Sequence, residues 1–159
     1  MTKTDKDNIA DGGSKEFLTA TVAGQIFGIP VLQVQDVLSE QKVTRVPLAP
    51  KEIAGSLNLR GRVVTAINLR HKLGMPEKPA EMKTMYIVVE HKGELYSLIV
   101  DSVGEVLSLP DTDFEKTPVT LEASWRALAI GIYRLKDELL VILDVPGMLE
   151  ALFMKDDAA

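Results

Sequence analysis

The chain contains an approximate internal repeat, and this feature constrains its fold more than any other. A shift of 69 residues lays segment 24–39 over segment 93–108, with matches at one glycine, three valines, one leucine and one serine. A shift of 76 residues lays segment 55–69 over segment 131–145. β-rich sequences also align with themselves by chance, because hydrophobic alternation is common. The shared order of hairpin, valine-rich segment, glycine and hairpin favours a duplication, which predicts two small barrels of similar topology.

Short runs of branched and aromatic residues recur along the chain, and turn residues such as Ala23-Gly24-Gln25 separate them. Many short strands joined by turns are typical of an all-β sandwich or barrel. The expected strands cover residues 17–22, 26–29, 56–59, 62–69, 85–90, 94–100, 105–109, 127–135 and 138–145.

A helix is expected near the C-terminal end of the chain. Asp144 is a suitable N-cap, and Pro146 fits the first helical turn. The apolar residues that follow recur at spacings of one, three and four, which places them on one face. This face is expected to pack on the core, and its residues are Met148, Leu149, Leu152 and Phe153.

One folded unit is expected between residues 16 and 154. With 46% hydrophobic residues, the chain has enough apolar side chains to form a real core. Residues 1–15 mix charge with glycine and show no apolar period, so we expect a flexible tail there. Residues 155–159 are expected to form a second flexible tail.

The charge balance and the missing motifs exclude several functions. Eighteen Lys and Arg against 23 Asp and Glu give a net charge of −5, which leaves no basic surplus for nucleic acid. The chain has no cysteine, and neither His71 nor His91 has partners at metal-ligand spacing. Phosphate-binding loops, dinucleotide turns and nucleophile elbows have no sequence support. We therefore expect no enzyme activity, no metal and no cofactor.

The sequence also predicts a cytoplasmic location. The first residues are polar where a signal peptide is apolar. No apolar run approaches the roughly 20 residues that span a bilayer.

Three ordered segments carry a family resemblance. They are Val43-Thr-Arg-Val-Pro-Leu-Ala-Pro50, Ile53-Ala-Gly-Ser-Leu-Asn-Leu-Arg-Gly61 and Val63-Val-Thr-Ala-Ile-Asn-Leu-Arg70. Together they resemble the signature of the CheW family, the coupling proteins of bacterial chemotaxis arrays. The resemblance implies an all-β fold of two interlocked, SH3-like, five-stranded β-barrels with short helices, so that residues 16–154 would form one domain of two intertwined subdomains.

The resemblance also implies a non-enzymatic adaptor with two partners. One is the cytoplasmic tip of a methyl-accepting chemoreceptor, and the other is the regulatory domain of a CheA-type histidine kinase. Such an adaptor is recruited from the cytoplasm to membrane-associated receptor arrays without inserting into the membrane.

Matching the family motif residue by residue gives a receptor-binding set of Val34, Asp36, Arg60 and Val103. The valines would cover apolar receptor side chains, and the charges would set the register. Arg60 is the strongest candidate, because a guanidinium binds a carboxylate bidentately. The family usually has Glu where this chain has Asp36, a side chain that is one methylene shorter.

The same match gives a kinase-binding set of Val43, Thr44, Val46 and Gly55. Val43 and Val46 are the expected anchors, although alternation alone does not distinguish an interface valine from a core valine.

Two alternatives remain open at this point. An adaptor of the same fold could serve another receptor-kinase pathway, such as surface motility or a second-messenger system. A small β-barrel enzyme or ligand carrier would instead need a closed apolar pocket with convergent polar groups.

Overall fold

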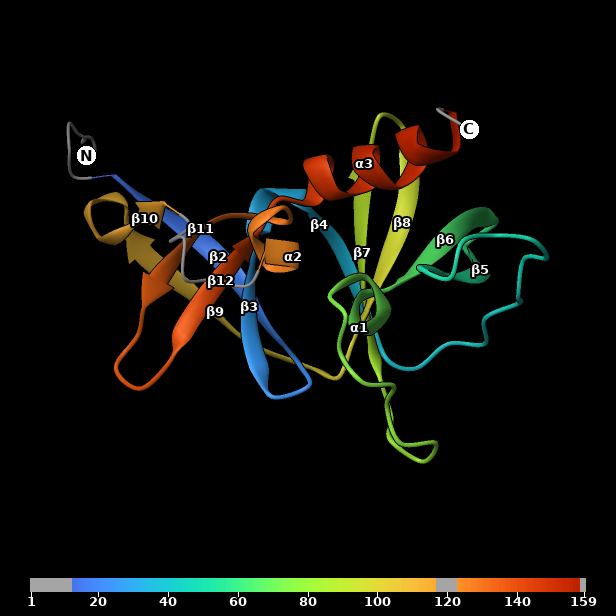
Figure 1. Cartoon of the computed structure of the whole chain (residues 1–159), viewed down its shortest axis with the longest axis horizontal. Coiled ribbons are helices and arrows are strands. Elements are labelled where there is room, and N and C mark those ends of the chain that lie inside the picture. The colour runs from blue at the N-terminus through green and yellow to red at the C-terminus, as the bar shows by residue number, and fades with distance from the viewer. Residues whose placement is uncertain (1–12, 117–122, 158–159) are drawn as a thin grey trace.

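The computed structural model describes residues 13–116 and 123–157 of the chain, which form two β-sheets side by side (Figure 1). Sheet 1 consists of β2 (Ser14–Val22), β3 (Gln25–Pro30), β9 (Ser102–Pro110), β10 (Glu115–Lys116), β11 (Ala129–Arg134) and β12 (Leu139–Leu143). Sheet 2 consists of β4 (Val34–Leu38), β5 (Ile53–Leu59), β6 (Arg62–Asn68), β7 (Met85–His91) and β8 (Glu94–Val100). The helices are η2 (Val31–Gln33), α1 (Leu69–Lys72), η3 (Asp111–Asp113), α2 (Ala123–Arg126) and α3 (Val145–Asp157).

The prediction of an all-β fold with short helices is confirmed. Sheet 2 has the expected five strands, whereas sheet 1 has a sixth, the two-residue strand β10. The strands expected from sequence patterns include neither β4 nor β10, and β10 has only two residues, too few to show alternation.

The two sheets have the same strand order, which confirms the predicted duplication. The order β11-β12-β3-β2-β9 in sheet 1 corresponds to β5-β6-β8-β7-β4 in sheet 2. The register agrees as well: Phe27 pairs with Val141 in parallel, and the residues at the corresponding repeat positions, Tyr96 and Thr65, also pair in parallel. Residues at equivalent positions of the sequence repeat therefore pair in the same way in the two sheets.

The sheets are interlocked by an exchange of hairpins. The first repeat runs from β2 to α1, and the second from β7 to α3. The β2–β3 hairpin of the first repeat lies in sheet 1 with β9, β11 and β12 of the second repeat. The β7–β8 hairpin of the second repeat lies in sheet 2 with β4, β5 and β6 of the first. Each sheet is therefore completed by a hairpin from the other repeat.

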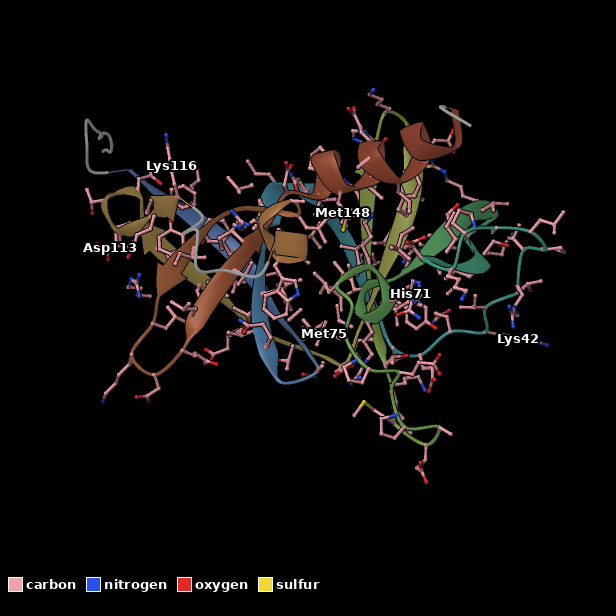
Figure 2. The ribbon with its side chains drawn as sticks, viewed as in Figure 1. Lys42, His71, Met75, Asp113, Lys116 and Met148 are labelled. Carbon is pink, nitrogen blue, oxygen red and sulfur yellow. The ribbon has the colours of Figure 1, made fainter. Side chains whose placement is uncertain are left out.

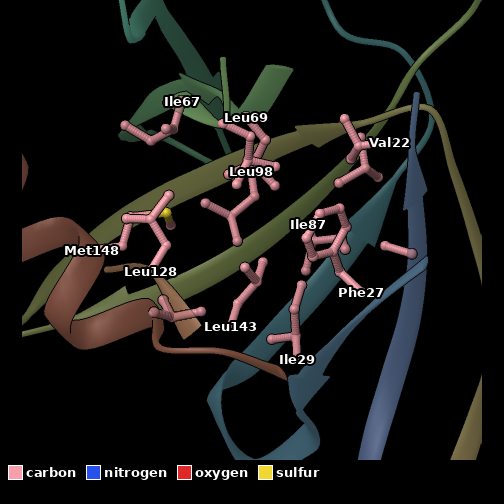
Figure 3. Close-up of a cluster of buried hydrophobic side chains, with 14 of the residues drawn as sticks. Val22, Phe27, Ile29, Ile67, Leu69, Ile87, Leu98, Leu128, Leu143 and Met148 are labelled. Atoms are coloured by element: carbon pink, nitrogen blue, oxygen red, sulfur yellow. The ribbon is translucent and has the colours of Figure 1, made fainter. Parts of the chain in front are cut away.

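The largest hydrophobic core lies between the sheets and joins them (Figure 3). Phe27 and Ile29 enter it from sheet 1, whereas Ile87 and Leu98 enter it from sheet 2. Met148 of α3 is fully buried in the same cluster. Because burial of one such side chain contributes about 2 kcal/mol, this shared core holds the two sheets together.

The predicted C-terminal helix is confirmed. The Asp144 carboxylate accepts a hydrogen bond from the backbone N–H of Gly147 at 3.1 Å, as an N-cap does. Met148, Leu149 and Leu152 are buried, as predicted, and the side chain of Phe153 lies outside the described residues. In Figure 1, α3 lies across β7 and β8 after leaving sheet 1. The helix therefore bridges the two sheets.

Both expected tails are shorter than the sequence predicted, because a strand extends into the first and a helix into the second. β2 begins at Ser14, and Ser14 and Lys15 pair with Pro110 and Leu109 of β9. Backbone pairing thus orders two residues that have no apolar period. At the other end α3 continues to Asp157, beyond the expected boundary at residue 154. Residues 1–12 and 158–159, the rest of the expected tails, lie outside the described part of the chain.

Within the described ranges, no helix combines the length and the apolar character needed to cross a membrane.

Candidate functional surfaces

Two of the predicted receptor-binding residues, Asp36 and Arg60, contact each other. Arg60 Nη2 donates to Asp36 Oδ2 at 3.1 Å. Arg60 is the first central residue of the β5–β6 turn, where Arg60 and Gly61 have φ angles of 52° and 85°, as in a type I′ hairpin turn. Because β4 and β5 are the two edges of sheet 2, this ion pair joins edges that the sheet order places far apart. Sheet 2 therefore curls toward a barrel.

The two predicted receptor-binding valines occupy corresponding positions in different sheets. Val34 pairs with Val89 at the start of β4, and Val103 pairs with Ala20 near the start of β9. Both valines are partly buried and pack against the core between the sheets. The structure thus brings Asp36 and Arg60 into contact, and it places Val34 and Val103 on the edge strands β4 and β9.

Three of the predicted kinase-binding residues lie together at the edge of sheet 2. Thr44 and Ser56 exchange two backbone hydrogen bonds of 2.8 Å each. Gly55 has a φ of 151°, and a Cβ atom at this position would overlap the Thr44 carbonyl oxygen and approach the Val43 side chain. Only glycine allows this close approach. We name Val43, Thr44 and Gly55 the Thr44 clamp.

The two expected valine anchors differ in burial. Val43 is partly buried and packs against the small core of sheet 2, so it contributes to the barrel interior. Val46 is 46% exposed and lies on the loop that follows the clamp. On the same loop, Leu48 is fully exposed with a φ of 66°. Sequence reasoning missed Leu48, because an apolar residue between two prolines gives no sign of its exposure.

Two adjoining depressions lie beside this loop, with volumes of about 510 and 530 Å³. Figure 2 shows His71 and Met75, which line the first of them. His71 and Glu77 line both depressions and are exposed, so the depressions open to solvent. Charged side chains, including Arg45 and Lys51, contribute to their walls. A ligand carrier would instead need a closed apolar pocket.

A nearly buried ion pair, Arg70 with Asp101, lies where the two sheets meet. Arg70 Nη2 and Nε donate to the two Asp101 carboxylate oxygens at 2.7 and 3.1 Å. The Ala23 backbone N–H donates to Asp101 at 2.8 Å. Burial by itself would raise the pKa of Asp101, but the hydrogen bonds from Arg70 and Ala23 and the positive charges of Arg70 and Lys78 hold it below its ordinary value. Sequence patterns did not predict this pair, because its two residues lie 31 positions apart in the chain.

The two histidines have different surroundings, and neither belongs to a metal site in the described residues. His71 is exposed at the end of α1, where its backbone N–H donates to Asn68. His91 Nε2 lies 3.2 Å from a carboxylate oxygen of Glu150, which Lys92 also contacts at 2.8 Å. These contacts hold α3 against the β7–β8 turn. Within residues 13–116 and 123–157, no group of three potential ligands comes together.

Comparison with known proteins identifies the family. The sequence model of the CheW-like domain matches residues 16–153. The chain belongs to the CheW family. It is 30% identical to the chemotaxis protein CheW of Helicobacter pylori, over 89% of this chain and 90% of that protein. It is 31% identical to the chemotaxis protein CheW of Klebsiella aerogenes, over 86% of this chain and 82% of that protein.

A solved CheW structure has the same fold. The scaffolding protein TtCheW from Thermoanaerobacter tengcongensis superposes with a TM-score of 0.77 at 26% identity, covering 87% of this chain and 94% of that one. CheW-family proteins are scaffolds and adaptors of chemotaxis signalling, and membership assigns this chain to the same role as a coupling adaptor. Membership of this family implies that the chain interacts with chemotaxis receptors and a chemotaxis kinase.

Proposed function

We propose that this chain couples the cytoplasmic tips of methyl-accepting chemoreceptors to the regulatory domain of a CheA-type histidine kinase, without catalysing a reaction. It would act in the cytoplasm and be recruited to membrane-associated receptor arrays. The match of the CheW-like domain to residues 16–153 is the observation that carries this proposal. We assign each of the two partners to a separate surface of the described chain.

The proposed receptor surface consists of Val34, Asp36, Arg60 and Val103. Arg60 is 77% exposed and its partner Asp36 is 29% exposed, so the guanidinium keeps donors available for a carboxylate on a receptor. Val34 and Val103 lie on the edge strands β4 and β9 and are only partly buried. Apolar contact at the valines and a charged contact at Arg60 would together bind and align a receptor helix.

The proposed kinase surface consists of the Thr44 clamp together with Val46. The clamp fixes the backbone that leads into the loop, and Val46 then extends into solvent. An exposed valine on a backbone held by two hydrogen bonds is suited to a preorganised apolar contact. In this arrangement Val46 would contact the kinase directly, whereas Val43 and Gly55 would hold the loop in place.

The proposed mechanism is a shift of populations. A receptor state that binds the adaptor differently from another state changes the equilibrium of the attached kinase, and a coupling of about 1–3 kcal/mol is sufficient. Such a mechanism requires both partners to bind at once. The Arg60 side chain and the exposed Val46 lie on different loops of sheet 2, which is consistent with simultaneous binding.

The receptor surface is tested with Arg60→Glu. Binding of the full chain to a receptor cytoplasmic fragment is measured by titration calorimetry, and the variant is expected to lose at least tenfold in affinity, about 1.4 kcal/mol. Arg134→Glu is the matched control, because Arg134 is similarly exposed and also pairs with a carboxylate, that of Glu115 at 2.8 Å. Equal losses in both variants, or none in Arg60→Glu, would refute the receptor surface.

The kinase surface is tested in the same way with Val46→Asp. This variant is expected to weaken binding to the kinase regulatory domain at least tenfold and to leave receptor binding unchanged. Val63→Asp is the control, because Val63 is another exposed valine of sheet 2 that lies on β6, outside the proposed surface. If Val63→Asp weakens kinase binding as much as Val46→Asp does, the proposed surface is wrong.

A further inference from the structure

The Arg70–Asp101 pair lies where the chain crosses from one sheet to the other. Asp101 is the residue between β8 of sheet 2 and β9 of sheet 1. Arg70 belongs to α1, which follows β6 of sheet 2, and Ala23 belongs to the β2–β3 turn of sheet 1. Since Asp101 accepts hydrogen bonds from both Arg70 and Ala23, its carboxylate joins the two sheets directly.

The geometry of the pair leaves little freedom. The side chains of Arg70 and Asp101 are only 11% and 14% exposed, and their contact is bidentate. Arg70 Nη1 also donates to the Pro76 carbonyl at 2.8 Å, and the Asp101 backbone N–H donates to the Thr21 carbonyl at 2.9 Å. A bidentate pair with both partners further hydrogen-bonded holds one orientation of the two sheets.

The corresponding position in the other repeat has no such pair. Leu32 precedes Asp101 by 69 residues and occupies the equivalent crossing between β3 and β4. Leu32 is 96% exposed. Pro146 lies 76 residues after Arg70 and therefore occupies the position equivalent to Arg70. Because one crossing forms without an ion pair, the duplicated fold itself does not require Arg70 and Asp101.

The pair also lies close to one residue of each surface of the proposed function. Val103 of the receptor surface is two residues after Asp101. Arg70 and Asp101 line the same depression as Ala54, the neighbour of Gly55 in the Thr44 clamp. A shift of Asp101 would therefore move the start of β9, and a shift of Arg70 would move the wall beside the clamp.

We propose that Arg70 and Asp101 are positioning residues that transmit receptor binding to the kinase surface by fixing the relative orientation of the two sheets. This inference rests on the proposed function. It concerns the coupling between the two binding events, and neither residue is proposed to contact a partner.

The test measures coupling separately from binding. The affinity of the full chain for the kinase regulatory domain is determined with and without a saturating receptor cytoplasmic fragment, and the ratio of the two affinities is the coupling. We expect a ratio of about fivefold or more for the wild type. For Arg70→Gln we expect a ratio below about twofold, with both separate affinities within about twofold of the wild type.

Lys15→Gln is the matched control, because Lys15 forms an exposed ion pair with Asp111 at 3.0 Å away from the crossing. It is expected to keep the wild-type ratio. Arg70→Lys retains the charge but not the bidentate contact, so its ratio should lie between those of the wild type and Arg70→Gln. Thermal unfolding identifies variants that are folded at the measuring temperature, and Arg70→Lys replaces Arg70→Gln as the deciding variant if the latter is unfolded.

An unchanged ratio in a folded Arg70 variant would overturn the inference. Loss of one separate affinity in a folded variant would also overturn it, since the pair would then belong to a binding surface. If the wild type binds neither partner, the proposed function itself is refuted. If the wild type binds both with a ratio of one, only the coupling is refuted.

Discussion

The two sheets keep the same backbone pairing but differ in the size of some side chains. Besides the core that they share, each sheet has a smaller hydrophobic cluster of its own, and we call the part of the sheet that holds this cluster its end. At the end of sheet 1, Phe114 packs edge-on against Tyr133, with ring centroids 5.6 Å apart. The same end buries Phe17, Tyr133, Leu140 and Ile142, and the corresponding positions in sheet 2 are Tyr86, Leu57, Val64 and Ala66. Apart from the ring pair Phe17 and Tyr86, every residue of the sheet 2 set is smaller. At these positions sheet 2 therefore uses smaller side chains than sheet 1 does.

The close backbone approach at each end is nevertheless the same. Gly131 faces the Glu115 carbonyl as Gly55 faces the Thr44 carbonyl, and a Cβ atom on either glycine would overlap that oxygen. Figure 2 shows Lys42, near the Thr44 clamp, and Lys116, beside Glu115, at opposite ends of the molecule. The two repeats have therefore kept the backbone contacts at these ends while the side chains there have diverged.

The largest effect is expected from making the end of sheet 1 resemble that of sheet 2. Ile142→Ala places alanine where sheet 2 already has Ala66, and it should reduce the free energy of unfolding by about 4 kcal/mol through the cavity left behind. Val64→Ala in sheet 2 removes fewer atoms and should cost about 2 kcal/mol. Urea denaturation measures both. A loss from Val64→Ala as large as that from Ile142→Ala would contradict this order, because Val64→Ala removes one carbon atom fewer.

The next effect comes from the crossing between the sheets. Asp101→Asn breaks a nearly buried ion pair and should cost about 3 kcal/mol at neutral pH. Because the folded protein has an Asp101 pKa below the unfolded value, the carboxylate stabilises the fold above the ordinary pKa of about 4 and loses this effect as pH falls through the folded pKa. The difference in unfolding free energy between wild type and variant should therefore shrink below about pH 4. A difference that is constant with pH would contradict the ionic contact.

An intermediate effect is expected at the two close glycines. Gly55→Ala and Gly131→Ala should each cost roughly 2–3 kcal/mol, because the new methyl group displaces a paired backbone segment. Gly61→Ala is the control, since Gly61 has a positive φ but open space around it, and it should cost only about 1 kcal/mol. Thermal unfolding of the three variants measures this order. Gly55→Ala should also weaken kinase binding, which Gly131→Ala should leave unchanged.

The smallest effect on stability is expected at the two acidic residues that occupy corresponding positions in β4 and β9. Asp36→Asn should reduce stability by about 0.2–1 kcal/mol, because it weakens an exposed ion pair with Arg60. Glu105 occupies the equivalent position in β9 and forms no ion pair within the described residues, so Glu105→Gln should change stability less. Chemical denaturation at low and high salt distinguishes the two, because only the Asp36 effect should decrease with salt.

The sequence predicted local structure well because hairpins and helix caps depend on neighbouring residues. The turn at Ala23–Gly24 and the cap at Asp144 are set by backbone preferences within a few residues. The repeat also predicted two sheets of one topology. It did not predict the exchange of hairpins between repeats, because alternation shows which face of a strand is buried and not which sheet the strand joins.

The site was predictable only in part for the same reason. The family motif placed Asp36 and Arg60 in one set, but their direct contact depends on the curl of sheet 2. Arg70 and Asp101 each follow an apolar run, where a charged residue ordinarily lies in solvent. Their burial results from the crossing between the sheets, which no local pattern records. Ser14 and Lys15 likewise pair with β9 across a long separation.

Co-sedimentation, with kinase activity measured in the same sample, tests whether this adaptor couples a receptor to a kinase. The full chain is mixed with receptor-bearing membranes and a CheA-type kinase, with Arg60→Glu as the comparison and Arg134→Glu as the control. We expect the wild type and the control to be recovered with the membranes together with the kinase and to change its autophosphorylation, and we expect Arg60→Glu to do neither. Recovery of the wild type in the supernatant with both partners present, or bound kinase with unaltered activity, would contradict this expectation.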